Sequence, residues 1–220
     1  NCTQPSFSSL IPFHPNSAPA SGPPRVAVGD FNGDGIPDVA ITGRSDFAAV
    51  QILLGDGKGN FQEAAGSPLP AGRLPNQLVA ADLNRDGKED LLIVDAVASG
   101  EIKIYLSDGD GNFHATIAPH LVGLVTPVSL AVARFREITG ELDLLVGHAD
   151  VPWASIFFKD GGDDYYSVSR PSVSSTGEVT VRAGDFNRDG NADFAAVDLG
   201  SGMVTVKLGG GDGYFDPAPG

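Results

Sequence analysis

The nine residues Asp30-Phe31-Asn32-Gly33-Asp34-Gly35-Ile36-Pro37-Asp38 form a pattern that recurs along the chain. The segments 82–90 and 185–193 repeat Asp at positions 1, 5 and 9, Asn at position 3 and Gly at position 6. A degraded copy occupies residues 134–143. The first positions fall at 30, 82, 134 and 185, so the spacing is 52, 52 and 51 residues. A fixed period of this length is typical of a repeat architecture whose units pack against their neighbours.

Each copy of the loop is surrounded by the same series of short apolar runs. One run precedes the loop, as in Val26–Val28, and one follows it, as in Val39–Ile41. A third run, Val50–Leu54, ends at a Gly/Asp turn, and an aromatic residue such as Phe61 opens a fourth. Four short strands per repeat, bounded by turn residues, indicate one blade of a β-propeller. We therefore expect an all-β chain of four four-stranded blades that close into a four-bladed ring.

The period also sets the expected boundaries of the chain's parts. The repeats should cover about 25–76, 77–128, 129–178 and 179–220, with residues 1–24 as an extended N-terminal segment. Residues 6–11 resemble a further outer strand, which could complete the last blade or add to the edge of a neighbouring molecule. Cys2, the only cysteine, is a candidate for an intermolecular bridge. Asn1 begins an Asn-Cys-Thr pattern that permits glycosylation.

The loop pattern itself predicts a metal site. Side-chain oxygens at positions 1, 3, 5 and 9 converge, the carbonyl at position 7 can join them, and Gly at position 6 permits a sharp turn. Oxygen ligands of this kind suit Ca²⁺, whereas zinc prefers His or Cys. We expect three calcium sites, with these ligands: Asp30, Asn32, Asp34, Ile36 and Asp38; Asp82, Asn84, Asp86, Lys88 and Asp90; Asp185, Asn187, Asp189, Asn191 and Asp193.

The degraded loop has lost this ligand set. Arg134 and Arg136 stand where the first loop has Asp30 and Asn32, while Asp143 keeps the ninth position after a one-residue insertion. One hypothesis is that a guanidinium replaces the cation and pairs with Glu137, Glu141 or Asp143. The alternative is simple decay of the loop. In either case this loop should bind no metal.

These loops and their spacing resemble the FG-GAP (VCBS-type) repeats of integrin α-subunit propellers and related bacterial extracellular proteins. The resemblance covers about residues 25–216. It implies a propeller with calcium between the inner strands and a role in adhesion, carbohydrate binding or scaffolding. The family commonly has seven blades, whereas this sequence supplies four.

Charge and motifs exclude several classes of function. Asp and Glu outnumber Lys and Arg by 28 to 14, which disfavours nucleic acid as a partner. No apolar run approaches the roughly 20 residues of a membrane-spanning helix. The chain lacks the nucleophile elbow, the zinc-protease motif and the phosphate-binding loop, and its four histidines are scattered. We therefore expect a non-enzymatic protein.

The sequence favours a secreted or cell-surface structural module. Its partner would be a second copy, in a homo-oligomer or filament, or another extracellular protein or glycan. A lectin-type propeller is the alternative, in which Trp153 stacks on a sugar ring. An accessory domain of a polysaccharide-active enzyme is a less favoured interpretation.

Overall fold

The computed structural model describes residues 24–42, 48–97, 99–116, 121, 124–149, 151–161, 165–173 and 177–218. The expected strand at residues 6–11 and the calls on Asn1 and Cys2 lie outside this part of the chain. Every named element in the described residues is a β-strand. No helix found there has the length and apolar character required to cross a membrane.

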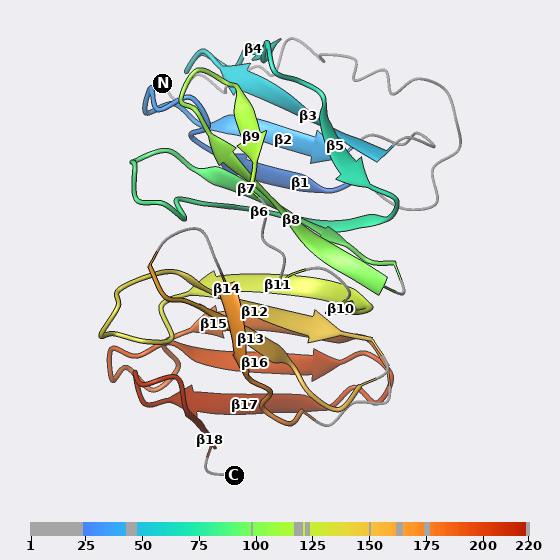
Figure 1. Ribbon diagram of the computed structural model, residues 1–220, viewed down its shortest axis with the longest axis vertical. Coiled ribbons are helices and arrows are strands. Elements are labelled where there is room, and N and C mark those ends of the chain that lie inside the picture. The colour runs from blue at the N-terminus through green and yellow to red at the C-terminus, as the bar shows by residue number, and fades with distance from the viewer. Residues whose placement is uncertain are drawn as a thin grey trace, which may run out of the picture.

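The strands form four separate antiparallel sheets, one for each sequence repeat (Figure 1). We number these sheets blades 1 to 4. Blade 1 contains β1 (Val26–Gly29), β2 (Asp38–Thr42), β3 (Ala48–Gly55), β4 (Phe61–Glu63) and β5 (Leu69–Gly72). Blade 2 contains β6 (Pro75–Ala81), β7 (Asp90–Asp95), β8 (Ser99–Ser107), β9 (Phe113–Ala115) and β10 (Leu124–Val125). Blade 3 contains β11 (Pro127–Ala133), β12 (Asp143–His148), β13 (Ser155–Lys159) and β14 (Tyr165–Ser169), and blade 4 contains β15 (Val179–Gly184), β16 (Asp193–Asp198), β17 (Val204–Gly209) and β18 (Phe215–Pro217).

Blades 3 and 4 have the four strands that the sequence predicts, in the order β11-β12-β13-β14 and β15-β16-β17-β18. Blades 1 and 2 each gain a fifth strand, because β5 pairs with β3 and β10 pairs with β8. Both additions use short segments near the end of their repeats that carry no strong strand pattern. The expectation of four strands per blade therefore holds for two blades and falls one strand short for the others.

Three apolar clusters of buried side chains lie between consecutive blades. Alternate residues of a strand point to opposite neighbours. In β7, Leu91 and Ile93 belong to the cluster shared with blade 1, while Leu92 and Val94 belong to the cluster shared with blade 3. All four side chains are fully buried. The continuous apolar runs that follow each loop are explained by this burial on both faces.

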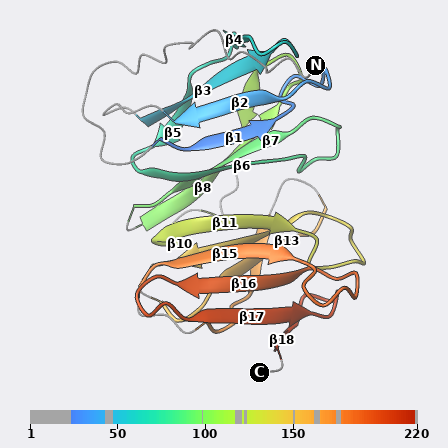
Figure 2. The ribbon, with the colours of Figure 1, turned by 180° about the vertical axis from the view of Figure 1, so that it is seen from behind.

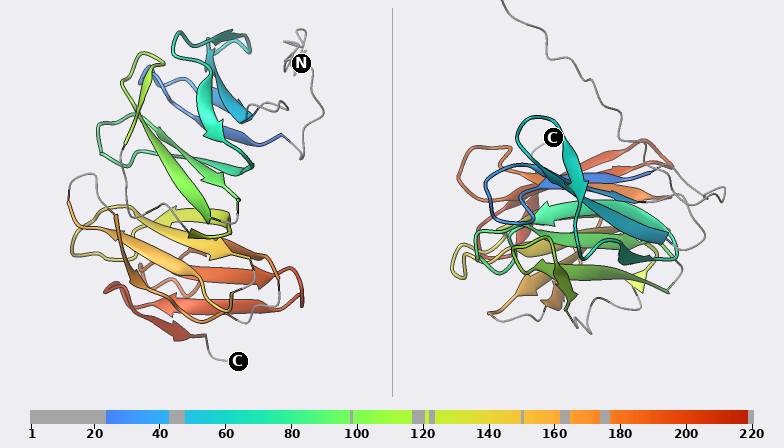
Figure 3. Two further views of the ribbon diagram at one scale, coloured as in Figure 1. Left: turned by 45° about the vertical axis from the view of Figure 1, so that its right-hand side comes forward. Right: turned by 90° about the horizontal axis from the view of Figure 1, so that it is seen from above.

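The four inner strands, β1, β6, β11 and β15, lie near one another, and the blades spread outward from them (Figure 2). A pocket of about 520 Å³ lies among these strands. Extensive contacts join β1 to β6, β6 to β11 and β11 to β15. In the described residues no contact of that extent joins blade 4 to blade 1, so closure into a four-bladed ring is not seen. Figure 3 shows the same open row of blades from two other directions.

Candidate functional site

The four repeated loops connect the first two strands of each blade and lie along the same side of the molecule, at the left in Figure 1. In three of them the first Asp closes a compact turn on its own backbone. The Asp30 carboxylate accepts N–H groups from Gly33 at 2.7 Å, Asp34 at 3.1 Å and Gly35 at 2.8 Å. Asp185 accepts the N–H groups of the corresponding residues Arg188, Asp189 and Gly190. Asp82 accepts those of Asp86 and Gly87.

Positions 3 and 5 are held together in the same three loops. The amide nitrogen of Asn32 donates to the Asp34 carboxylate at 3.0 Å, and the N–H group of Ile36 donates to the other oxygen of Asp34 at 2.7 Å. The same pair of contacts forms at Asp86 and at Asp189. These backbone and side-chain donors favour the charged form, and the pKa of Asp189 is lowered by its contacts with Asn191 and then Asn187. The structure therefore joins the side chains of the third and fifth positions, while the first position bonds the backbone of the same loop.

The backbone takes the same left-handed turns in each of these loops. At position 6, Gly35, Gly87 and Gly190 have φ of 80°, 85° and 93°. At position 4 two arginines do the same, with φ of 63° at Arg85 and 65° at Arg188. A positive φ is uncommon in a residue other than glycine and persists only where the surrounding loop requires it. The loop conformation is thus a shared feature that does not depend on the residue at position 4.

The ninth position has a role that the sequence pattern did not reveal. Asp38 is fully buried and accepts two N–H groups, from Phe31 in its own loop at 2.9 Å and from Gly55 at the end of β3 at 2.8 Å. It therefore joins three consecutive segments of the blade. The same two contacts recur at the ninth position of every blade, at Asp90, Asp143 and Asp193.

Burial at the ninth position is the main cause of a shifted pKa. Loss of solvent raises the pKa of Asp38, and the charges of Asp34 and Asp30 raise it further against the two N–H contacts. Asp90 shows the same upward shift with Asp86 and Asp82 as neighbours. These negative neighbours show that the buried carboxylate lies within electrostatic reach of the loop. A bound cation would relieve that repulsion.

The donor set of the three loops fits a hard cation, although the carboxylates are not gathered around one point. Among the described residues, no group of three or more His, Cys, Asp or Glu side chains is placed to hold a metal as it stands. Most of the loop oxygens accept N–H groups instead, as given above. In the second loop the ammonium group of Lys88 also contacts Asp86 at 2.7 Å. Calcium binding would need these side chains to turn inward, and at the second loop it would compete with Lys88.

The degraded third loop is held by arginine. The Arg136 guanidinium donates to Asp160 at 2.6 Å and to the carbonyl of Lys159 at 2.8 Å, lies 3.5 Å from Asp143, and stacks over the Phe158 ring at 4.5 Å. Of the three partners expected for a guanidinium here, Asp143 is the one that the structure shows.

Two of the other residues singled out in this loop have different contacts. Arg134 donates to the carbonyl of Gly140 at 3.0 Å. Glu141 faces Arg85 at 3.7 Å and Lys159 at 3.8 Å, so it contributes to the contact with blade 2. A charged network therefore occupies the place where the other blades have their acidic loop.

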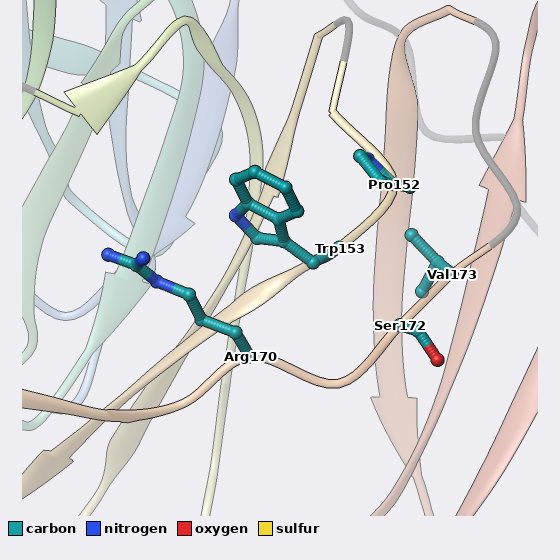
Figure 4. Close-up of a pocket in the computed structure, with 5 residues that line it drawn as sticks. All are labelled: Pro152, Trp153, Arg170, Ser172 and Val173. Atoms are coloured by element: carbon teal, nitrogen blue, oxygen red, sulfur yellow. The ribbon is translucent and has the colours of Figure 1, made fainter.

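Trp153 lies at a separate cavity of about 530 Å³ on blade 3, lined also by Pro152, Arg170, Ser172 and Val173 (Figure 4). The indole is half-buried and Arg170 is exposed beside it. No other described residue forms an ion pair with the Arg170 guanidinium. Arg170 was not identified from the sequence, because an isolated arginine before a proline carries no motif.

The comparisons with known proteins agree with the repeat. Residues 30–93, which span the first loop and the second, match the family described as FG-GAP-like repeat. This part of the chain consists of FG-GAP-like repeats. The match confirms the resemblance drawn from the loops, and it does not extend to features particular to integrins. No curated protein matches the chain.

Proposed function

We propose that this protein is an extracellular structural or adhesion module whose three acidic loops bind Ca²⁺. The observation that supports calcium is the threefold recurrence of one loop geometry, with oxygen donors at positions 1, 3 and 5 above a buried carboxylate. Calcium is abundant outside cells, which suits an ion that stabilises a secreted fold. That the chain is not an enzyme, and that it self-assembles, stay predictions.

Calcium binding to the native state should raise the stability of the protein measurably. With a Kd on the order of 10⁻⁴ M, about 2 mM calcium contributes roughly 1.8 kcal/mol per site. Calorimetric titration should give three ions per chain, and the melting temperature should fall by many degrees in EDTA. An unchanged melting curve, or a fourth ion bound at Arg134, would contradict the proposal.

A matched pair of variants separates the loops from the other acidic turns. Asp86→Ala should remove one ion, because Asp86 supplies the fifth position of the second loop. Asp110→Ala should remove none. Asp110 lies in the turn between β8 and β9, where its carboxylate accepts the N–H group of Asn112 at 3.0 Å. Loss of an ion from the Asp110 variant would assign calcium to that turn instead.

The Trp153 cavity favours carbohydrate binding as a second candidate function. The accessible part of a half-buried indole can stack on the apolar face of a sugar ring, and a guanidinium recognises a carboxylate through paired hydrogen bonds. The side chains of Trp153 and Arg170 together suit an acidic sugar. A glycan array should show binding that Trp153→Ala abolishes and that Arg170→Ala abolishes for acidic glycans alone. Tyr214→Ala is the control, since Tyr214 is an exposed aromatic on another blade; equal loss there, or no binding by the unaltered protein, would exclude this candidate.

A further inference from the structure

Blades 1 and 4 stand at the two ends of the row. Each leaves exposed an apolar face whose equivalent in blades 2 and 3 is buried. Equivalent positions are fixed by the pairing of each ninth-position Asp with the inner strand: Asp38 with Gly29, Asp90 with Ala81, Asp143 with Ala133 and Asp193 with Gly184. In blades 2 to 4, the residue three positions before this partner packs against the preceding blade, and Val26 occupies the same position in blade 1. The residues at this position are Val26, Leu78, Leu130 and Val181.

On this side, blade 1 differs from the other three blades. Leu78, Leu130 and Val181 are 6%, 1% and 0% exposed, because a preceding blade covers each of them. Val26 is 56% exposed. Blade 1 therefore carries the residue that fits a preceding blade without having one in the described structure.

The opposite side of blade 4 shows the complementary pattern. Each ninth-position Asp accepts one N–H group from the end of the third strand of its blade. In blades 1 to 3, the residue five positions before that N–H group points toward the following blade. At this position Val50, Ile102 and Ala154 are 0%, 4% and 0% exposed, whereas Val204 of blade 4 is 61% exposed. Leu199 and Met203, next to it, are also more than half exposed. In the described part of the chain, no blade covers this side of blade 4.

A polar contact between inner strands repeats in the same direction. The side-chain amide of Gln77 bonds both the N–H and the carbonyl of Leu130 in the next blade. Ser129, one repeat later, bonds the carbonyl of Val179 and the N–H of Val181. Thr180 occupies this position in blade 4 and has no such partner among the described residues. Val26 occupies in blade 1 the position that Val181 has in blade 4. Its backbone is therefore the group that Thr180 would bind.

We propose that the exposed face of blade 4 packs on the exposed face of blade 1 of a second copy of this chain. Each face carries apolar residues at the positions that pack against a neighbouring blade at the three internal interfaces. In Figure 2 blades 1 and 4 extend in opposite directions from the inner strands, and Val26 of blade 1 and Leu199 of blade 4 line the same pocket among those strands. One partner can therefore satisfy both faces, and a two-fold symmetric dimer closes a ring of blades. This inference does not depend on calcium binding.

The mass of the protein in solution tests the proposal. Light scattering coupled to size-exclusion chromatography, in buffer with calcium, should give twice the 22.7 kDa of one chain. Val26→Glu and Val204→Glu should each raise the dimer Kd by at least about 100-fold, because each places an unpaired carboxylate in an apolar interface. Both residues are exposed in the single chain, so each variant should keep the unaltered circular dichroism spectrum.

Ile138→Glu is the control, because Ile138 is 93% exposed in the third loop, away from both faces. It should leave the dimer intact. A monomer at all concentrations would overturn the proposal, and a monomer whose melting temperature falls in both Val variants would show that blades 1 and 4 meet within one chain. Dimers that survive both Val→Glu changes would place the contact elsewhere, as donation of a terminal strand would.

Discussion

At the residue scale, the ninth-position Asp combines two roles that a sequence cannot separate. A metal ligand and a buried acceptor of two N–H groups both require a carboxylate at the same place in the repeat. The third loop separates them, because Asp143 is kept where the other acidic ligands are replaced. Its carboxylate accepts the N–H groups of Phe135 at 3.2 Å and Lys159 at 3.0 Å. Retention of Asp143 in a degraded loop was the available signal for the structural role.

Asp143→Asn should destabilise the protein without any change in metal content. The amide can accept one of the two N–H groups and turns its own donor toward the other, which leaves a buried N–H group unpaired. That loss should lower the free energy of unfolding in urea by about 1–3 kcal/mol, equally with and without calcium. Asp216→Asn is the matched control, because Asp216 is an exposed residue of β18. Equal stability of the two variants would show that the buried contacts contribute nothing.

His148 is a buried titratable group in the same blade and is 2% exposed. One ring nitrogen contacts the carbonyl of Val125 at 2.7 Å and the other contacts the Ser155 hydroxyl at 2.8 Å. Burial lowers the pKa of His148 from 6.5; the contact with Val125 opposes this shift and the charge of Arg170 adds to it. The folded protein therefore keeps this side chain neutral under conditions in which the unfolded chain binds a proton.

Stability should consequently fall as the pH drops below about 6.5. In that window the unfolded state binds more protons than the folded state, so acidification favours unfolding until the lowered pKa is reached. Urea midpoints measured between about pH 8 and pH 5 should show this slope, and His148→Gln should reduce it. The buried carboxylates with raised pKa bind protons more readily in the folded state, so through them acidification favours folding. A slope unchanged in His148→Gln would assign the acid sensitivity to other groups.

At the element scale, the strands could be predicted because their pattern repeats. The runs before and after each loop became β1 and β2 and their counterparts in the other blades. The fifth strands, β5 and β10, could not be predicted, since β5 contains Pro70 and Gly72, and β10 is two residues long. They pair with β3 and β8 because those strands extend beyond the others and leave backbone groups available.

The third loop shows how an element keeps its conformation with different chemistry. Arg136 connects this loop to β13 and its turn through Lys159 and Asp160, and its guanidinium is largely shielded by Phe158. The sequence supports a guanidinium here as one hypothesis beside simple decay of the loop, and it does not choose between the two arginines. The choice depends on the neighbouring β13, which only the fold brings alongside.

Arg136→Ala should therefore destabilise blade 3 more than Arg134→Ala does. The first removes charged contacts to two residues and a ring contact, for an expected loss of about 2–3 kcal/mol, while the second removes one contact to a carbonyl. Chemical denaturation should give the same difference in calcium and in EDTA. A loss that appears only in calcium would mean that the third loop also takes part in metal binding.

At the scale of the whole molecule, the repeat predicted the blades but not how the row ends. Every blade-to-blade contact uses residues of two adjacent repeats, so the sequence specifies each interface locally. Closure depends on the angle accumulated over all the blades, which no single repeat encodes. The residues equivalent to Val26 and Val204 in the other repeats are core residues, whereas the structure leaves these two more than half exposed.

The position of a blade in the row should also set its resistance to hydrogen exchange. Strands β7 and β12 are buried at every residue and have a blade on each side, whereas β1 and β17 are covered on one side in the described structure. At low protein concentration the amides of β7 and β12 should therefore exchange most slowly, and those of β1 and β17 should open first. If a second copy covers the outer faces, raising the concentration should slow exchange in β1 and β17 while β7 and β12 stay unchanged, because only the outer strands gain a neighbour. Mass spectrometry of peptides from the four strands measures this directly, and Val204→Glu supplies the control in which the concentration dependence should disappear. Protection of β1 and β17 equal to that of β7 at every concentration would mean that both outer faces are already covered within a single chain.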